Sequence, residues 1–259
     1  MITRLYDKVF IYEHLVKNQS LFAYHIGDLD PIFFSDCIWY GRIEQNALME
    51  IVLIYHSLPT PTVLAFGLTP SMPQLVEAIR DKLPPRFFCH YSKELEPIFT
   101  SSYDITPLGT HHKMDFHSFR VDFSLREVHE CVQLTTRDAS SLRELYQIAY
   151  PGNYFNPHML ASRKYYGIKQ GEKILSVAGI HVYSRTYRIA VLGNITTHPL
   201  MRNQGLATQC IVTLLKTLEP DVDFIGLNVK ADNFTAITLY QKIGFSLASG
   251  YEEALFEKY

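Results

Sequence analysis

The stretch from Asn194 to Thr208 constrains the fold more than any other part of the chain. An apolar, β-branched run from Tyr187 to Leu192 precedes it and is typical of a buried strand. Residues Leu206 to Leu218 follow it with the spacing of an amphipathic helix. A turn containing Gly205 joins the two elements. The first N–H groups of such a helix have no partner inside the helix and lie at the positive end of its dipole. The turn therefore predicts a site for an anion such as a pyrophosphate.

The residues of this turn resemble a known cofactor signature. Arg202 to Ala207 read Arg-Asn-Gln-Gly-Leu-Ala, which is similar to the Gln/Arg-x-x-Gly-x-Gly/Ala signature of the GNAT superfamily of acetyl-CoA-dependent N-acetyltransferases. Thr197-His198-Pro199 stands where the fourth strand of that family ends. A second resemblance, to the other cofactor motif of the family, involves Leu227 to Asn233, Ala236, Tyr240, Gly244 and Phe245. The resemblance covers about half of the chain, from roughly Val132 to the C-terminus.

This resemblance implies the mixed α/β sheet of the GNAT acyltransferase fold, here in two lobes. The first half repeats the order of the family's elements but has no Arg-x-x-Gly-x-Ala turn. Pro70 and Pro73 stand near the equivalent position and lack the N–H groups that a phosphate needs. We therefore predict a degenerate, truncated GNAT-like companion lobe at residues 1–125 and a catalytic N-acetyltransferase domain at residues 126–259.

Hydrophobic periodicity and turn residues predict the elements of each lobe. We expect an opening helix at Leu5–Val16 and a turn-rich junction at Ser101–Asp115. We expect a helix N-capped by Asp138 and a closing hairpin at Phe245–Lys258. Strands are expected at Cys37–Ile43, Leu48–Tyr55, Thr62–Phe66, Arg86–His90, Cys131–Thr135, Tyr165–Lys169, Ile174–Tyr183, Tyr187–Thr197 and Phe224–Val229.

Composition excludes several classes of function. The formal net charge is −2, and charged residues are spread out, which disfavours a nucleic-acid surface or an anionic membrane as partner. No apolar run reaches the ~18 residues that span a bilayer, and the N-terminus lacks a signal-peptide pattern, so we expect a cytoplasmic protein. The four cysteines have no metal-binding spacing, and adjacent His111 and His112 would face opposite sides of a strand. We expect no metal.

The resemblance makes acetyl-CoA the cosubstrate. Its pantetheine arm would lie between the fourth and fifth strands, which a bulge at Gly193-Asn194 would separate. Four residues assigned to the cofactor also have a structural interpretation. Ile195 and Thr197 could pack within the strand, Arg202 could lie at the solvated surface, and Asn233 could cap a helix. The residues assigned to the cofactor are Ile195, Thr196, Thr197, Arg202, Asn203, Gln204, Gly205, Leu206, Ala207, Thr208, Asn228, Asn233 and Tyr240.

Three residues are the candidates for catalysis. Tyr240 would protonate the departing thiolate, and the backbone N–H of Ile195 would stabilise the oxyanion. Family members that acetylate protein N-termini often have a glutamate base where this chain has Asn228, and an amide does not accept a proton at neutral pH. His181 is therefore the first candidate base, since the imidazole pKa is near ~6.5. Core packing is the alternative for both Tyr240 and His181. Weaker candidate bases are Glu252, Glu253 and His198, of which His198 fits the strand exit better.

The resulting hypothesis is a transferase that moves the acetyl group of acetyl-CoA to a primary amine of a small molecule or peptide, by direct attack in a ternary complex. The alternatives are a non-catalytic acyl-CoA-sensing module and a two-lobed acyl or aminoacyl transferase with a larger acceptor. The acceptor would be selected by loops around Tyr154 to Tyr166, which do not identify it. Homodimer formation is left open.

Overall fold

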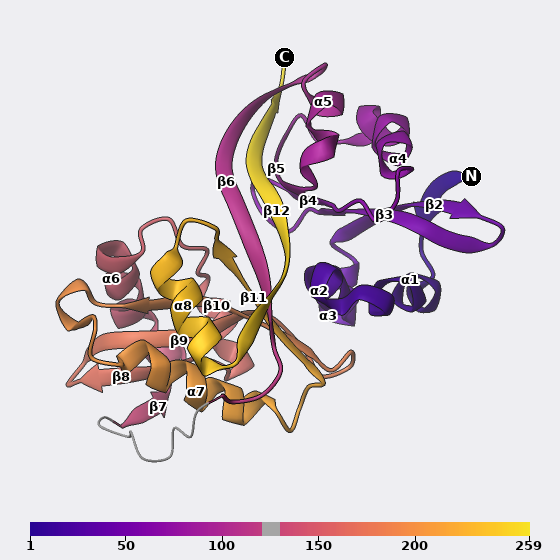
Figure 1. The fold of residues 1–259 in the computed structure, drawn as a ribbon. Coiled ribbons are helices and arrows are strands. Elements are labelled where there is room, and N and C mark those ends of the chain that lie inside the picture. Colours follow the sequence, from indigo (N-terminus) through magenta and orange to yellow (C-terminus); the bar gives the residue numbers. More distant parts are fainter. Residues whose placement is uncertain (121–129) are drawn as a thin grey trace. The chain divides into compact units, whose positions relative to one another are not determined.

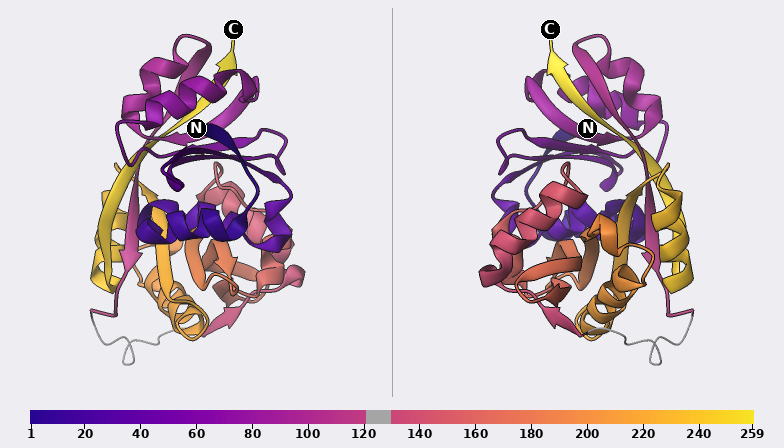
Figure 2. Two further views of the ribbon diagram at one scale, coloured as in Figure 1. Left: turned by 90° about the vertical axis from the view of Figure 1, so that its right-hand side faces the viewer. Right: turned by 90° about the vertical axis from the view of Figure 1, so that its left-hand side faces the viewer.

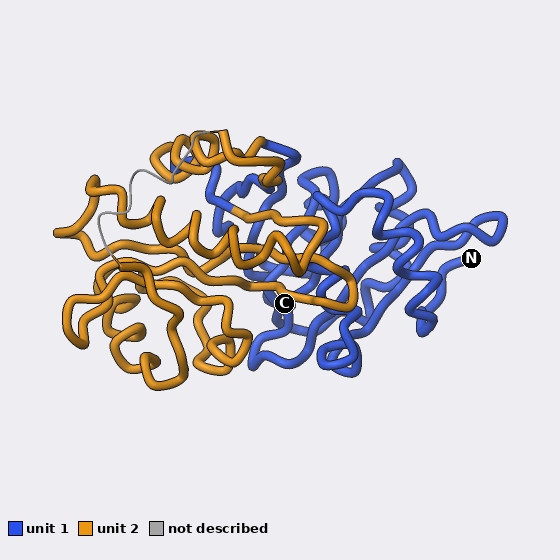
Figure 3. The backbone as a smooth tube through the Cα atoms, turned by 90° about the horizontal axis from the view of Figure 1, so that it is seen from below, with its two compact units in different colours: residues 1–113, 229–233, 247–259 blue, residues 114–228, 234–246 orange. Residues whose placement is uncertain are grey.

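The computed structural model describes residues 1–120 and 130–259. The chain divides into two compact units that are not contiguous in sequence (Figure 3). The first unit comprises residues 1–113, 229–233 and 247–259, and the second comprises residues 114–228 and 234–246. The predicted lobe boundary between residues 125 and 126 lies outside the described residues and stays a prediction.

The N-terminal half begins with a strand, three helices and three strands (Figure 1). Asp7 caps the first helix by accepting hydrogen bonds from the N–H groups of Val9 and Phe10. The elements are β1 (Ile2–Leu5), α1 (Lys8–Leu15), α2 (Gln19–Asp28), α3 (Pro31–Phe34), β2 (Cys37–Glu44), β3 (Ala47–Tyr55), β4 (Thr62–Ala65), α4 (Met72–Ile79), β5 (Arg86–Tyr91), α5 (Glu96–Phe99) and β6 (Tyr103–Phe116).

The C-terminal half repeats this order of elements. The amphipathic helix predicted at Leu206–Leu218 is α7, and a 3-10 helix at Pro157–Ser162 lies between α6 and β8. The elements are β7 (Cys131–Gln133), α6 (Ala139–Ala149), β8 (Tyr166–Gln170), β9 (Lys173–Ser184), β10 (Ile189–Thr197), α7 (Leu206–Leu218), β11 (Phe224–Lys230), α8 (Phe234–Ile243) and β12 (Phe245–Lys258).

The strands form one mixed sheet in the order β1-β2-β3-β4-β5-β12-β6-β11-β10-β9-β8-β7. Within the first unit, α1 to α3 lie on one face of β1–β5, and α4 and α5 lie on the other (Figures 1 and 2). In the second unit, α7 packs on β8, β9 and β10 and also contacts α8. This is the two-lobed mixed α/β architecture that the sequence predicts.

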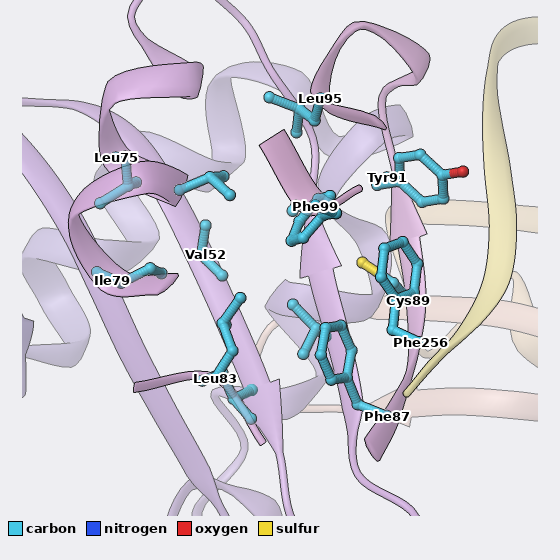
Figure 4. Packing of buried hydrophobic residues seen from close by; sticks show 14 of the residues in the cluster. Val52, Leu75, Ile79, Leu83, Phe87, Cys89, Tyr91, Leu95, Phe99 and Phe256 are labelled. Atoms are coloured by element: carbon cyan, nitrogen blue, oxygen red, sulfur yellow. The ribbon is translucent and has the colours of Figure 1, made fainter. Parts of the chain in front are cut away.

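The core of the first unit combines aliphatic side chains with stacked and edge-on aromatic rings (Figure 4). Phe87 of β5 stacks on Phe256 of β12 with ring centroids 5.0 Å apart, and Phe99 of α5 meets Phe256 edge-on at 4.8 Å. All three side chains are fully buried. Because Phe256 comes from the end of the chain, burial of its ring attaches the C-terminal strand to the N-terminal half.

Several local predictions were wrong, and each for a physical reason. The expected junction at Ser101–Asp115 is strand β6, and the expected closing hairpin is the single strand β12. Both strands lie inside the sheet, so their pairing comes from segments distant in sequence and not from local periodicity. The opening helix begins only at Lys8, after β1. Thr135, not Asp138, caps the turn before α6, and the Asp138 carboxylate accepts from the Thr135 N–H in return.

His25 is fully buried in the first unit among aromatic side chains. Its ring lies 5.1 Å from that of Phe22 and 5.6 Å from that of Phe66, and the Lys113 ammonium lies 4.5 Å from the Phe66 ring. Burial lowers the pKa of His25 well below its usual 6.5, and the charge of Lys113 lowers it further. The folded state therefore keeps this imidazole neutral where the unfolded chain would protonate it.

We predict that the stability contributed by a neutral His25 is present above pH 6.5 and is lost as the pH falls below that value. Lowering the pH from 7.5 to 5.5 should cost on the order of 1 kcal/mol through this residue. His25→Gln should remove that part of the pH dependence, as measured by urea unfolding at both pH values. The exposed His56 supplies the control, because His56→Gln should leave the difference unchanged. An unaltered pH dependence in His25→Gln would contradict this assignment.

Candidate functional site

Strands β10 and β11 pair only over their first residues. Their parallel register runs from Ile189 opposite Phe224 to Leu192 opposite Leu227 and ends there. On its other side, β10 shifts register against β9 between Gly193 and Thr196, and Asn194 has a φ of 55°. The bulge predicted at Gly193-Asn194 is therefore confirmed, and it lies where β10 leaves β11.

Asn194 holds the bulge through its side chain and its carbonyl group. Its amide Nδ2 donates to the carbonyl oxygen of Tyr154 at 2.8 Å and to the hydroxyl of Tyr165 at 2.9 Å. Its own carbonyl accepts a 2.8 Å hydrogen bond from the hydroxyl of Tyr146. Asn194 is only 3% exposed. Sequence reasoning missed this role, although asparagine is among the few residues that tolerate a left-handed conformation.

Gly193 is needed for the space that it leaves and not for an unusual backbone conformation. A positive φ occurs at Asn194 and not at Gly193. A Cβ on Gly193 would lie 2.4 Å from the ring of His181 on β9, so glycine makes room for the imidazole. The ring of Tyr154 meets His181 edge-on at 6.4 Å. Burial lowers the pKa of His181, and a hydrogen bond with Asn194 partly opposes that shift.

The turn before α7 presents its backbone to solvent. Gly205 has a φ of 79°, and a Cβ there would meet nothing within 4 Å. The N–H of Gln209 donates to the carbonyl of Gly205 at 3.1 Å as α7 begins, and no side chain caps the helix. The N–H groups of Leu206, Ala207 and Thr208 precede that bond and lie at the positive end of the helix dipole. This is the anion-binding geometry that the sequence predicts at this turn.

Other predicted site residues support the turn with their side chains. The guanidinium Nε of Arg202 donates to the carbonyl of Thr197 at 3.4 Å, and His198 Nδ1 accepts from the N–H of Leu200. Ser176 donates to the carbonyl of Thr196 at 3.2 Å, and its hydroxyl lies 2.8 Å from that of Thr197. Arg202 thus stabilises the turn, and His198 lies directly after the end of β10. The next two residues, Asn203 and Gln204, are exposed.

Tyr240 and Asn228 both have buried polar atoms in the second unit. Tyr240 on α8 is 7% exposed, and its ring meets Phe245 edge-on at 5.9 Å. Burial raises the pKa of Tyr240, and Tyr150 raises it further. Asn228 lies one residue beyond the last β10–β11 pair, and its amide Nδ2 is buried without a hydrogen-bond partner among residues 1–120 and 130–259. Asn233 immediately precedes α8.

The two glutamates considered as bases have partners within the first unit. Thr110 donates to the Glu252 carboxylate at 3.0 Å. The Glu253 carboxylate lies 3.4 Å from His111 Nε2 and 3.8 Å from His90 Nε2. In the described ranges, no group of three or more histidine, cysteine, aspartate or glutamate side chains is arranged to hold a metal ion. No described helix is long and apolar enough to cross a membrane.

The equivalent turn of the first unit is filled by a side chain. The fully buried Glu50 carboxylate accepts hydrogen bonds from the N–H groups of Thr69 at 2.7 Å and Leu68 at 3.2 Å. Strands β4 and β5 pair as far as Ala65 opposite Tyr91, and the N–H of Ser92 extends the pairing to the Ala65 carbonyl. The Glu50 carboxylate thus occupies the turn that leads to α4, three to four residues before that helix begins.

Comparison with known proteins identifies the second half of the chain. Residues 128–245 match the acetyltransferase (GNAT) family. No curated protein matches the chain. The likeness to solved structures is one of fold, because sequence identity is low.

Three solved structures illustrate that likeness. A Drosophila protein is 13% identical with a TM-score of 0.75, covering 98% of this chain and 97% of its own. A GCN5-related N-acetyltransferase from Sphaerobacter thermophilus is 10% identical with a TM-score of 0.60, covering 98% and 95%. A tandem GNAT protein from the clavulanic acid biosynthesis pathway is 10% identical with a TM-score of 0.56, covering 98% of each chain. The repeated order of elements in this chain agrees with a tandem arrangement.

We predict that Gly193→Ala destabilises the protein by about 1–3 kcal/mol, because the added methyl group overlaps the His181 ring. Gly193→Ala should lower the free energy of unfolding less in a His181→Ala background than in the wild type, as measured by urea unfolding. Gly152→Ala is the control, since a Cβ there meets nothing within 4 Å. Simple additivity of the two substitutions would show that the ring is not the constraint.

Proposed function

Because residues 128–245 of the chain belong to the GNAT acetyltransferase family, we propose that the protein transfers the acetyl group of acetyl-CoA to a primary amine of a small molecule or peptide. One observation carries the proposal. The pairing of β10 with β11 ends at Leu192, and the same strand leads through a 3-10 helix at Pro199–Met201 and the turn at Gly205 into α7, whose first N–H groups have no side-chain cap. An extended chain that ends in a diphosphate fits these two features together.

The residues of the second unit suit the parts of coenzyme A. The N–H groups of Gly205 to Thr208 would hold the pyrophosphate, and the exposed Asn203 and Gln204 would flank it. The backbone of Ile195 to Thr197 would hydrogen-bond to the pantetheine amides as an added strand does. The buried Nδ2 of Asn228 supports this fit, because an amide donor without a partner is costly unless a ligand accepts from it. Acetyl-CoA, when bound, supplies an activated acetyl thioester.

Three groups of the chain would act on the reaction. The N–H of Ile195, next to the bulge, would donate to the thioester oxygen as negative charge develops there. Tyr240 keeps its proton at neutral pH because burial raises its pKa, so it would protonate the thiolate. His181 stays neutral because burial lowers its pKa, so it would accept the proton of the amine, directly or through water. Direct attack in a ternary complex needs no enzyme nucleophile.

One observation favours a non-catalytic role. Asn228 replaces the glutamate that serves as base in many related enzymes, and an amide does not accept a proton. An acyl-CoA-sensing module would bind the cofactor with the same backbone donors and need no base. Binding without turnover on any amine would favour this second function.

We predict that acetyl-CoA binds the wild-type protein and that Gly205→Ala weakens binding by at least about tenfold, because the φ of 79° and close approach of the phosphates both require glycine. Isothermal titration calorimetry measures the affinity. Gly171→Ala is a matched control, because Gly171 also has a positive φ of 60° and open space around its Cβ position. Equal affinities for the two variants would remove the turn from the binding site, and no heat with the wild type would overturn the proposal.

We predict that Tyr240→Phe lowers kcat by about 10²–10⁴-fold, because the variant lacks the proton donor, while acetyl-CoA affinity is retained. Release of coenzyme A in the presence of a panel of amines measures turnover. Tyr103→Phe is the control, because it removes the hydroxyl of a buried tyrosine in the first unit and should leave kcat unchanged. If Tyr240→Phe turns over at the wild-type rate, Tyr240 is not the acid.

A further inference from the structure

A cleft of about 350 Å³ opens within the second unit at the end of α6. This volume is at the lower end of the range for small-molecule sites. The cleft does not belong to the turn before α7 or to the β10–β11 gap, and the proposed cofactor contacts leave it unused. Its lining residues are Arg143, Tyr146, Gln147, Pro151, Asn153 and Phe155.

Tyr146 connects this cleft to the bulge. Its side chain is 2% exposed, its ring lies 5.1 Å from that of Phe155, and its hydroxyl donates to the carbonyl of Asn194 at 2.8 Å. The residue after Asn194 is Ile195, whose N–H is the proposed oxyanion donor. A molecule in the cleft therefore lies one side chain away from the backbone that would hold the thioester.

The loop after α6 forms the other side of the cleft. Tyr150 precedes the lining residue Pro151 in the sequence, and its electrostatic effect raises the pKa of Tyr240. The loop after α6 is fixed there, because Asn153 donates to the Tyr150 carbonyl from both its backbone N–H and its Nδ2. Through Tyr146, the cleft thus lies beside the bulge that precedes the Ile195 N–H, which is a position that suits an acceptor.

The charge of the cleft comes from one side chain. Arg143 and Gln147 are four residues apart on α6 and share a helix face with Tyr146. Arg143 is exposed, and no carboxylate among residues 1–120 and 130–259 forms an ion pair with it. The other five lining residues carry no charge. A guanidinium in this position is available to a carboxylate, which it binds through two parallel N–H donors, and it repels a second ammonium group.

We propose, on the basis of the proposed acetyltransferase function, that the acceptor is a small primary amine that also bears a carboxylate, and that Arg143 binds this carboxylate. The amine of such a molecule would extend from the α6 end of the cleft toward Ile195 and Tyr240. Amino acids are therefore favoured as acceptors over their amides, and polyamines are disfavoured. Arg143 selects the acceptor and takes no part in the proton transfers.

The test compares amino acids with their C-terminal amides as acceptors, with spermidine and O-phosphoethanolamine added to separate polyamines and phosphate-bearing amines. The wild type should favour acids over amides by at least about tenfold in kcat/KM. Arg143→Gln should lose at least about tenfold on the acids, mainly in KM, and change little on the amides. Arg143→Lys should recover part of the loss, since lysine keeps the positive charge but lacks the two parallel N–H donors of the guanidinium. Arg137→Gln, which removes an exposed arginine outside the cleft, is the control.

Acetyl-CoA affinity, measured separately by calorimetry, distinguishes the failure of this inference from that of the proposed function. If acetyl-CoA binds and amines are acetylated without preference for the acids, the assignment of Arg143 falls while the acetyltransferase function remains. An equal loss on acids and amides in Arg143→Gln has the same meaning. A preference for O-phosphoethanolamine or spermidine would replace the carboxylate with those classes. If acetyl-CoA does not bind, the proposed function fails and this inference fails with it.

Discussion

The backbone of Asn194 is the constraint on which the second unit depends. Its left-handed conformation puts β10 out of register with β9, and the pairing with β11 ends two residues earlier. Such a conformation in a non-glycine residue persists only where the surroundings fix it. Here, three tyrosines supply the fixing hydrogen bonds to the Asn194 side chain and carbonyl. The chain after the bulge therefore keeps backbone donors and acceptors that an ordinary sheet would have paired.

The two repeats have the same order of elements but differ at the turn that follows the fourth strand of each. In the second, an open glycyl turn precedes α7 and the strands beside it separate. In the first, the Glu50 carboxylate accepts from the corresponding turn and the strands stay paired. A buried carboxylate needs such donors, and donors that serve it are not available to a phosphate.

Local sequence was sufficient where an element's own residues determine it. The β-branched run before Leu192, the amphipathic spacing of α7 and the turn at Gly205 each predicted the observed structure. It was insufficient for β6, whose exposed polar residues are typical of a loop, and for β12, which was expected to be a hairpin, because both strands pair with segments distant in sequence. The same limit applies to the site. The signature identified the turn, whereas the role of Asn194 depends on tyrosines, and the proposed role of Arg143 on a cleft, that only folding brings together.

Burial shifts the pKa values of the two titratable groups of the proposed reaction in opposite directions. It raises the pKa of Tyr240 and lowers that of His181, because a desolvated phenol and a desolvated imidazole both favour their neutral forms. The phenol therefore retains the proton that an acid must donate, and the imidazole lacks the proton that a base must accept. Both groups are ready at neutral pH without a charged partner. Under the proposed function, the phenol and the imidazole thus start in the protonation states of an acid and a base, while Asn228 accepts no proton.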